Sequence, residues 1–230
     1  MNISLPVGAE VAARTALRPQ RQALPGRFVT LVPLAPEHAD SLYELSHGPE
    51  REGLWAYLPI GPFASRPDFD AHIARCAASE DPLFFAILDG GRAVGHATYL
   101  RIDVPQRSIE VGFILYTPAL QRTPGASEAM YLMARHVFED LGYRRYEWKC
   151  NALNAPSMRA ARRFGFTFEG VFRQHMIVKG RNRDTAWFSM LDREWPARKA
   201  AYEAWLAPDS FDKSGTQLRS LLDLMAESGR

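Results

Sequence analysis

Apolar residues recur along this chain with two different periods, one typical of helices and one typical of strands. Residues 127–141 have the clearest helical period, because their apolar members fall at i, i+3, i+4, i+7, i+8 and i+11 and share one helix face. In residues 108–116 and 144–151, apolar or aromatic side chains alternate with other residues. This alternation predicts strands with one buried face.

The same reading along the rest of the chain predicts strands and helices that follow one another in a mixed order. The turn Asp89-Gly90-Gly91 indicates an antiparallel hairpin between the strands on either side of it. We expect strands at residues 28–34, 83–88, 93–102, 108–116, 144–151, 166–178 and 185–191, and helices at 36–47, 67–79, 127–141, 154–164 and 195–206. This order predicts an α+β (mixed α/β) domain around one sheet.

The two ends of the chain differ in pattern from its middle. Residues 1–26 carry small residues, scattered arginine and glutamine, and no sustained periodicity, which predicts a loose leader. We expect the domain itself to cover residues 27–207. Residues 208–230 are expected to form a tail with an amphipathic helix at 214–227 that docks on its own domain or on a partner.

Composition and charge narrow the class of protein. The chain has 230 residues, is 47% hydrophobic and 23% charged, and has 28 lysines and arginines against 26 aspartates and glutamates. These values are typical of a globular protein without a global field for nucleic acid or an acidic membrane, so we expect neither as a direct partner. No apolar stretch approaches the roughly 18 residues of a membrane span and no signal peptide is recognisable, which predicts a cytoplasmic protein.

Three features have a functional and a structural interpretation. Cys76 and Cys150 lack the spacing of a metal or redox pair, so we expect buried thiols and no metal site. The aromatic loop at residues 53–63 either floors a substrate pocket or packs on the core. The basic turn at residues 179–184 either binds a phosphate or an acidic substrate, or is a solvated hairpin, and we assign it no catalytic residue.

The loop between strand 108–116 and helix 127–141 has the outline of an anion site. Its residues of interest are Gln121, Arg122, Gly125, Ala126 and Ser127. Unpaired N–H groups at a helix start and the helix dipole favour a phosphate, small residues let it approach, and an arginine adds charge-assisted contacts. Many helices begin with small residues after a loop, so an ordinary helix start remains the alternative.

A second element is a short helix preceded by Asn154-Ala155-Pro156-Ser157 and followed by Gly165-Phe166. On its own, this sequence describes a capped helix with a glycine stop, and most such helices bind nothing. Its position after the first element changes its interpretation.

Taken in order, the two elements resemble the GNAT (Gcn5-related N-acetyltransferase) superfamily, and most closely its RimJ/RimL-like ribosomal-protein N-terminal acetyltransferase branch. The resemblance covers about residues 27–191. It is carried by Glu110-Val111-Gly112-Phe113, Ala126-Ser127-Glu128-Ala129, Asn154 with Ser157, the stretch from Gly165 to Gly170, and Gly180 with Asp184. The resemblance implies a single GNAT-like acyl-CoA N-acyltransferase domain with a central, mostly antiparallel twisted sheet flanked by helices.

The resemblance also implies an activity. Such enzymes use acetyl-CoA as cosubstrate, without a metal, and transfer the acetyl group by direct attack of a primary amine on the thioester. The acceptor is a protein N-terminus or a small-molecule amine. By resemblance, the backbone of Ile114, Leu115 and Tyr116 pairs with pantetheine, Asn154 lies beside it, and Ser157 stabilises the leaving thiolate.

Two departures from the family pattern bear on catalysis. Pro124 replaces the first glycine of the family's loop signature, and proline has no N–H for a phosphate. The loop must therefore shift so that Gly125 and Ala126 donate, or bind CoA less tightly. Met176 stands where this branch places a glutamate, and methionine cannot accept a proton.

The general base is therefore left to other residues. Glu110, acting through a water, is the first candidate and His175 is the second, and each also has a structural interpretation. The alternative function is a catalytically weak acyl-CoA-binding or sensing module of the same fold. A homodimer is left open as a further partner state.

Overall fold

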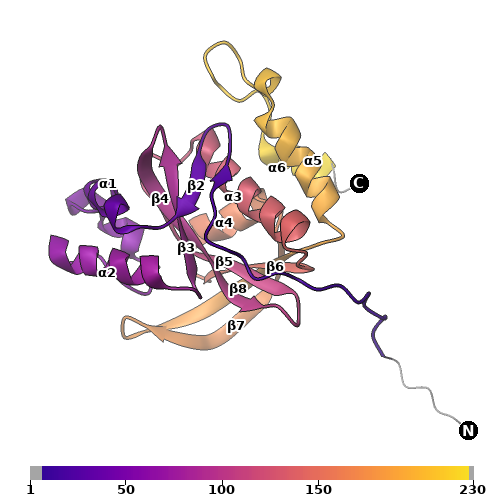
Figure 1. Ribbon diagram of the computed structural model, residues 1–230, viewed down its shortest axis with the longest axis horizontal. Helices are drawn as coiled ribbons and strands as arrows, with labels where there is room; N and C mark the ends of the chain where they lie inside the picture. The colour runs from indigo at the N-terminus through magenta and orange to yellow at the C-terminus, as the bar shows by residue number, and fades with distance from the viewer. Residues whose placement is uncertain (1–6, 228–230) are drawn as a thin grey trace, which may run out of the picture.

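The computed structural model of the protein describes residues 7–227, in which helices cover both faces of one sheet (Figure 1). The strands lie in the order β1-β2-β3-β4-β5-β6-β8-β7. They are β1 (Leu24–Pro25), β2 (Thr30–Pro33), β3 (Leu83–Asp89), β4 (Arg92–Asp103), β5 (Ser108–Tyr116), β6 (Arg145–Asn151), β7 (Thr167–Val178) and β8 (Arg181–Leu191). All neighbours pair antiparallel except β5 and β6, which are parallel.

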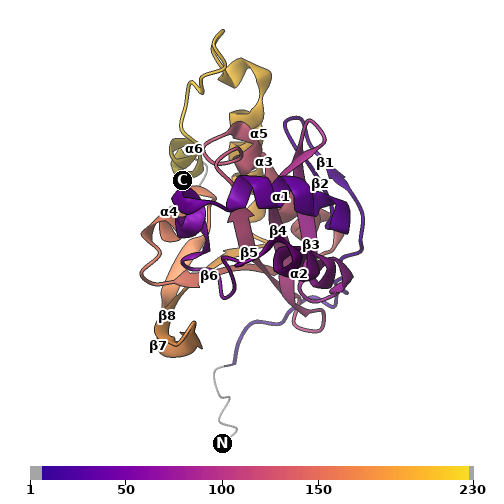
Figure 2. The ribbon, with the colours of Figure 1, turned by 90° about the vertical axis from the view of Figure 1, so that its left-hand side faces the viewer.

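Helices on the two faces form separate layers. The α-helices are α1 (Ala39–Ser46), α2 (Arg66–Ala78), α3 (Pro124–Arg135), α4 (Ala155–Arg163), α5 (Trp195–Leu206) and α6 (Leu221–Glu227). Short helices are η1 (Pro36–His38), η2 (Pro49–Trp55), η3 (His136–Asp140) and η4 (Pro208–Ser210). Figure 2 shows α1 and α2 in front of the sheet, while α3, α5 and α6 lie beyond it.

Strand alternation divides the core between these layers. In β3, Phe85 faces the larger apolar cluster, which includes α3 and α5, whereas Phe84 faces the smaller cluster of α1 and α2. Tyr99 of β4 is fully buried and donates its hydroxyl hydrogen to the carbonyl of Met133 in α3 at 2.8 Å. This architecture confirms the predicted α+β domain with a mostly antiparallel sheet flanked by helices.

The central strands β5 and β6 separate about half-way along β5. β5 pairs with β6 only from Ser108 to Val111. Further along, the pairing of β5 with β4 shifts register between His96 and Thr98, and Phe113 has a positive φ of 44°. This β-bulge bends β5 away from β6 and opens a gap in the middle of the sheet.

Several element boundaries differ from the sequence prediction, among them the starts of α3, β8 and α6. Helix α3 begins at Pro124 instead of residue 127, because the Thr123 hydroxyl caps the N–H of Ala126 and proline suits the first helical turn. Strand β8 begins at Arg181 instead of residue 185, since it pairs directly with Val178 across a tight turn. Helix α6 begins at Leu221 instead of residue 214.

Both ends of the described chain contact the domain. Ala16 and Leu24 are buried, and the N–H of Leu17 donates to the carbonyl of Leu141, so part of the segment expected to be a loose leader lies on the core. Helix α6 packs against α5 through Leu221 and Met225, both buried. No helix within residues 7–227 is long and apolar enough to cross a membrane.

Candidate active site

Two cavities meet at the gap between β5 and β6. The larger, about 1020 Å³, lies beside the start of α3 and beside α4, and we call it the helix-side cavity. The other, about 470 Å³, lies between the loop after η2 and the β7–β8 hairpin, and we call it the hairpin-side cavity. The residues that line both are Leu54, Ile114, Trp148, Asn154, Pro156 and Ser157.

The loop before α3 is held in place by its own side chains. The Gln121 amide donates to the carbonyl of Tyr116 at 2.7 Å, which fixes the loop to the end of β5. The Thr123 hydroxyl accepts from the N–H of Ala126 at 3.2 Å. In the described part of the chain, the N–H groups of Arg122 and Gly125 have no hydrogen-bond partner. They are the free donors at this helix start.

Proline at position 124 and glycine at position 125 suit this loop for different local reasons. Pro124 occupies the first turn of α3, where its missing N–H breaks no helical hydrogen bond. A Cβ atom on Gly125 would lie 2.6 Å from a methyl carbon of Val29, so a larger residue cannot fit against the sheet. Of the two donors expected to replace the family's glycine, Gly125 is free, whereas Ala126 is occupied by its cap.

Arginines from α4 add positive charge to the helix-side cavity. Arg159 and Arg163 line it, and Arg163 donates to the Ser127 hydroxyl at 2.9 Å. Burial lowers the pKa of Arg163, which has no carboxylate partner among residues 7–227. The sequence prediction missed both, although their i, i+4 spacing places them on one helix face.

Ser157 lies where the two cavities meet. Its N–H is capped by the Asn154 side chain at 3.1 Å, which fixes the start of α4. The Trp148 indole N–H donates to the Ser157 hydroxyl oxygen at 3.1 Å. Because an indole can only donate, the hydroxyl hydrogen of Ser157 is directed elsewhere, toward the cavities or the neighbouring Cys150 thiol.

Glu110 lies in the wall of the hairpin-side cavity and is 5% exposed. Its carboxylate is 2.9 Å from the Lys149 ammonium and 3.4 Å from Arg101. Burial raises the pKa of Glu110 and outweighs the lowering by Lys149. The carboxylate is thus more basic than an exposed glutamate.

Lys149 connects Glu110 to a wider charge network. The ammonium is also 2.7 Å from Glu147 and lies 3.7 Å from the centre of the Trp187 ring. Arg145 bridges Glu147 and Glu169. These contacts keep the Lys149 ammonium in place at the base of the cavity.

His175 and Met176 line the same cavity as Glu110. The His175 Nδ1 atom is 3.0 Å from the Thr185 hydroxyl, and its ring packs edge-on against Phe172. Both candidate bases therefore face one space, from different strands of the sheet. The contact with Thr185 fixes the orientation of the imidazole.

The tip of the β7–β8 hairpin is tied to the aromatic loop. The Lys179 ammonium donates to the carbonyls of Trp55 and Gly61. The basic turn is therefore engaged with the protein itself. In the loop, Trp55 is buried in the core, whereas Tyr57 lines the hairpin-side cavity, so both interpretations of the aromatic residues hold for different members.

Comparison with known proteins decides the family. The acetyltransferase (GNAT) domain family matches residues 29–167. The chain belongs to the GNAT acetyltransferase family. It is similar to the crystal structure of a GCN5-related N-acetyltransferase from Brucella melitensis, with 47% identity, a TM-score of 0.90, and coverage of 93% of this chain and 99% of that one.

Two further relatives bear on the branch of the family. The Bacillus subtilis (strain 168) protein named "Putative ribosomal N-acetyltransferase YdaF" is 25% identical over 179 residues, which are 74% of this chain and 95% of that protein. RimL, a ribosomal alpha-N-protein acetyltransferase, shares the fold with a TM-score of 0.65 at 18% identity, over 81% of this chain and 98% of its own. The resemblance to the RimJ/RimL-like branch is confirmed, and the GNAT fold implies acetyl-CoA as cosubstrate.

Residues far along the chain complete the helix-side cavity in a way that the sequence did not indicate. Trp205 at the end of α5 and Gly215, Thr216 and Gln217 from the following loop all line it. The Gln217 amide donates to the carbonyl of Trp205, which places this loop against the helix. No motif marks these residues, so only the tertiary fold reveals them.

Proposed function

We propose that the protein catalyses acetyl transfer from acetyl-CoA to a primary amine, either a protein N-terminus or a small-molecule amine, by direct attack of the amine on the thioester. The observation that carries this proposal is the meeting of two cavities at Ser157, one bordered by Arg122 with its free N–H group and by further arginines, and the other by Glu110 and His175. Such an arrangement lets two substrates approach one point from different sides.

The helix-side cavity suits CoA by its donors and by its size. The free N–H group of Arg122, with Arg159 and Arg163 in the same lining, favours a diphosphate at the start of α3, where the N–H group of Gly125 is also free. Beyond Val111, the edge of β5 that faces β6 is unpaired, so the backbone of residues 114–116 can pair with the amides of pantetheine like an added strand. Asn154 and Ser127 border the same space, although their side chains already serve Ser157 and Arg163.

The charges around the hairpin-side cavity favour a neutral amine. The charged residues that line it are Arg101, Lys149, Arg183 and Glu110, so cations outnumber the carboxylate. Nearby cations lower the pKa of an amine, and an amine must be neutral to attack. An α-amino group, with an ordinary pKa near about 8, needs less help than a lysine near about 10.4.

Different groups serve the three chemical tasks of the reaction: removal of the amine proton, stabilisation of the oxyanion and stabilisation of the leaving thiolate. Glu110 accepts the proton of the attacking amine through a water, as its raised pKa favours, and His175 is the second candidate. A backbone N–H group of residues 114–116 stabilises the developing oxyanion. The Ser157 hydroxyl, whose oxygen already accepts from Trp148, donates a hydrogen bond that stabilises the departing thiolate; Ser157 keeps its proton, and the thiolate takes its proton from water.

Thiol release from acetyl-CoA, measured across a panel of amines and peptides, tests the proposal. Replacing Ser157 with alanine should lower kcat by about 100-fold and leave the affinity for acetyl-CoA nearly unchanged. Ser41→Ala in α1, remote from both cavities, is the matched control. Unchanged turnover in Ser157→Ala would contradict the role of this hydroxyl. Thermal stabilisation by CoA without thiol release from any amine would instead favour the binding module.

A further inference from the structure

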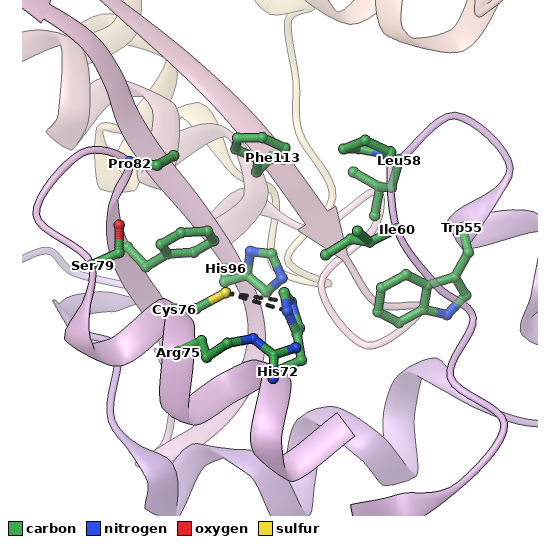
Figure 3. Close-up of a pocket in the computed structure, with 12 residues that line it drawn as sticks. Trp55, Leu58, Ile60, His72, Arg75, Cys76, Ser79, Pro82, His96 and Phe113 are labelled. Atoms are coloured by element: carbon green, nitrogen blue, oxygen red, sulfur yellow. Dashed lines mark hydrogen bonds between the residues drawn. The ribbon is translucent and has the colours of Figure 1, made fainter. Parts of the chain in front are cut away.

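A third cavity lies between α2 and the loop after η2, above the strands β3, β4 and β5. It has a volume of about 330 Å³ and we call it the side pocket (Figure 3). Its walls are mainly apolar and include Trp55, Leu58, Ile60, Pro82, Phe84 and Phe113. Figure 3 shows His96 in the middle of this ring of side chains, close to His72 and Cys76.

His96 presents an unused hydrogen-bond acceptor to the side pocket. The residue is 4% exposed, and its Nδ1 atom has no hydrogen-bond partner within residues 7–227. The ring also makes a hydrogen bond with the backbone of Phe113, which must therefore use Nε2 as donor. Because the proton is on Nε2, Nδ1 has a lone pair. The pocket therefore contains a buried hydrogen-bond acceptor that can bind a donor group of a ligand.

Apart from Arg75, the other titratable groups that line the pocket are uncharged. Burial lowers the pKa of His96 to about 3 and that of His72 to about 4, and it raises the pKa of the Cys76 thiol to about 11. The Cys76 sulfur lies 3.6 Å from Nδ1 and 3.4 Å from Nε2 of His72, so the thiol has a hydrogen-bond partner in this ring. Arg75 is exposed, so its charge lies at the rim. Inside this pocket a charged group would find no counter-ion other than Arg75 at the rim.

The side pocket adjoins the hairpin-side cavity. Leu58, Pro59 and Phe113 line both spaces. Phe113 is the bulged residue of β5, so the same bend that opens the gap in the sheet also brings this ring between the two cavities. A group attached to an amine in the hairpin-side cavity therefore has an apolar recess beside it.

We propose that the side pocket binds an uncharged aromatic group of the amine acceptor, with a hydroxyl on that group donating to Nδ1 of His96. This inference rests on the proposed function, because it concerns the acceptor of the same reaction. The volume of the side pocket is sufficient for an aromatic ring, since an apolar cavity of about 150 Å³ can hold a benzene molecule. Apolar burial of the ring supplies affinity, and His96 supplies selectivity for the hydroxyl.

A matched series of amines tests the inference with the full chain and saturating acetyl-CoA. The KM should fall about tenfold or more from propylamine to 2-phenylethylamine, because the ring leaves water. It should fall about threefold or more again for tyramine, which adds only the hydroxyl. Equal KM values for the three amines, with normal turnover, would overturn the inference and leave the proposed function intact.

Two variants locate the effect. Ser79→Phe places a ring in the side pocket and should abolish the preference for both aromatic amines, with KM for propylamine and acetyl-CoA unchanged. Ala78→Phe is the matched control, because Ala78 is exposed and is not part of the lining. His96→Leu should remove only the difference between tyramine and 2-phenylethylamine. A preference that survives Ser79→Phe would overturn the assignment.

A probe without an amine separates this inference from the reaction. Binding of 4-ethylphenol to the CoA-loaded protein, followed by NMR, should be at least threefold tighter than that of ethylbenzene and should be lost in Ser79→Phe but not in Ala78→Phe. Should no amine be acetylated, the proposed function fails and the acceptor role of the pocket fails with it. Binding of 4-ethylphenol in that case would show a ligand site unconnected with acetyl transfer.

Discussion

At the scale of single residues, the loop before α3 shows how one substitution alters an anion site. Pro124 gives the helix a rigid start but offers no N–H, and Thr123 already occupies the N–H of Ala126. The donors that remain free are Arg122 and Gly125. A phosphate at this helix start therefore meets fewer donors than the family's glycine would provide.

Replacing Pro124 with glycine should tighten CoA binding by about two- to tenfold, because it adds one N–H donor to the site. The same change should lower the free energy of unfolding by about 0.4–1 kcal/mol, since glycine makes the unfolded chain more flexible. Calorimetry with CoA and urea unfolding measure the two effects. Pro67→Gly, in the first turn of α2, is the control and should show the second effect only. Weaker CoA binding in Pro124→Gly would mean that the proline shapes the loop usefully.

Replacing Glu110 with glutamine should lower kcat by about 100-fold. In the unchanged protein, activity should fall as the pH drops through the raised pKa of Glu110, because the protonated carboxyl cannot accept a proton. This acidic limb should lie above the ordinary glutamate pKa of about 4.3 and should vanish in the variant. A pH profile of kcat/KM measures it.

Glu147→Gln is the matched control for that experiment. Glu147 contacts the same Lys149 ammonium but does not line the hairpin-side cavity, and Lys149 and Arg145 hold its pKa below the usual range despite burial. It should keep most of the turnover and the acidic limb. Equal losses in both variants would indicate that Glu110 only maintains the charge network.

At the scale of elements, one carboxylate joins the start of the sheet to α3. The Glu128 side chain accepts three backbone N–H groups, from Arg27 at 2.7 Å, Phe28 at 2.6 Å and Val29 at 2.9 Å. A Cβ atom on Gly26 would lie 2.6 Å from this carboxylate, so the glycine makes the close approach feasible. Glu128 is thus part of the fold, although it also falls within the family motif.

Replacing Glu128 with glutamine should lower the free energy of unfolding by about 2–3 kcal/mol. The amide has one acceptor oxygen in place of two, so a buried N–H loses its partner, and the remaining bonds lose their charge. Urea unfolding measures the loss. Glu203→Gln, an exposed position on α5, should change stability by less than about 1 kcal/mol. A similar small change in Glu128→Gln would contradict the structural role.

The sequence predicts most elements because their signals are local, and it fails where distant contacts decide. The caps at Asn154 and the periodicity of 127–141 are local, and α4 and the body of α3 follow them. The apolar spacing of residues 218–225 predicts a helix that begins at residue 214, yet the Asp212 carboxylate accepts the N–H groups of Ser214 and Thr216 and folds a turn instead. Local side-chain bonding overrides the pattern there.

The residues of the candidate site also divide into those that a local motif predicts and those that only the tertiary fold brings to the cavities. Ser157 and Asn154 were found because they belong to one short motif, and Glu110 because it lies in another. Lys149, Arg183 and the loop at 215–217 come to the cavities from other strands and from beyond α5. Their positions depend on the strand order and on the gap between β5 and β6, which no pattern within one segment records.

At the scale of the whole molecule, the two buried imidazoles of the side pocket make stability depend on pH. An unfolded histidine takes up a proton near pH 6.5, whereas His72 does so at about 4 and His96 at about 3 in the folded protein. Between these values the unfolded chain binds more protons. The contribution of these rings to stability is therefore complete above about pH 6.5 and is lost as the pH falls toward 4.

Urea unfolding at pH 7, 6 and 5 should show this loss. Well below pH 6.5, each ring contributes a slope of about 1.4 kcal/mol per pH unit to the free energy of unfolding. A variant with His72→Gln and His96→Leu should have a flatter dependence over this range, whatever its absolute stability. An unchanged slope would mean that other groups cause the acid sensitivity.

The gap between β5 and β6 has a kinetic consequence. The helix-side and hairpin-side cavities share a small set of residues around Ser157 and otherwise lie on different sides of the gap. Neither substrate has to vacate its space before the other enters. On the proposed direct transfer, both substrates are bound at once in a ternary complex, so double-reciprocal plots of initial rates should intersect, where a ping-pong enzyme with an acetylated intermediate would give parallel lines.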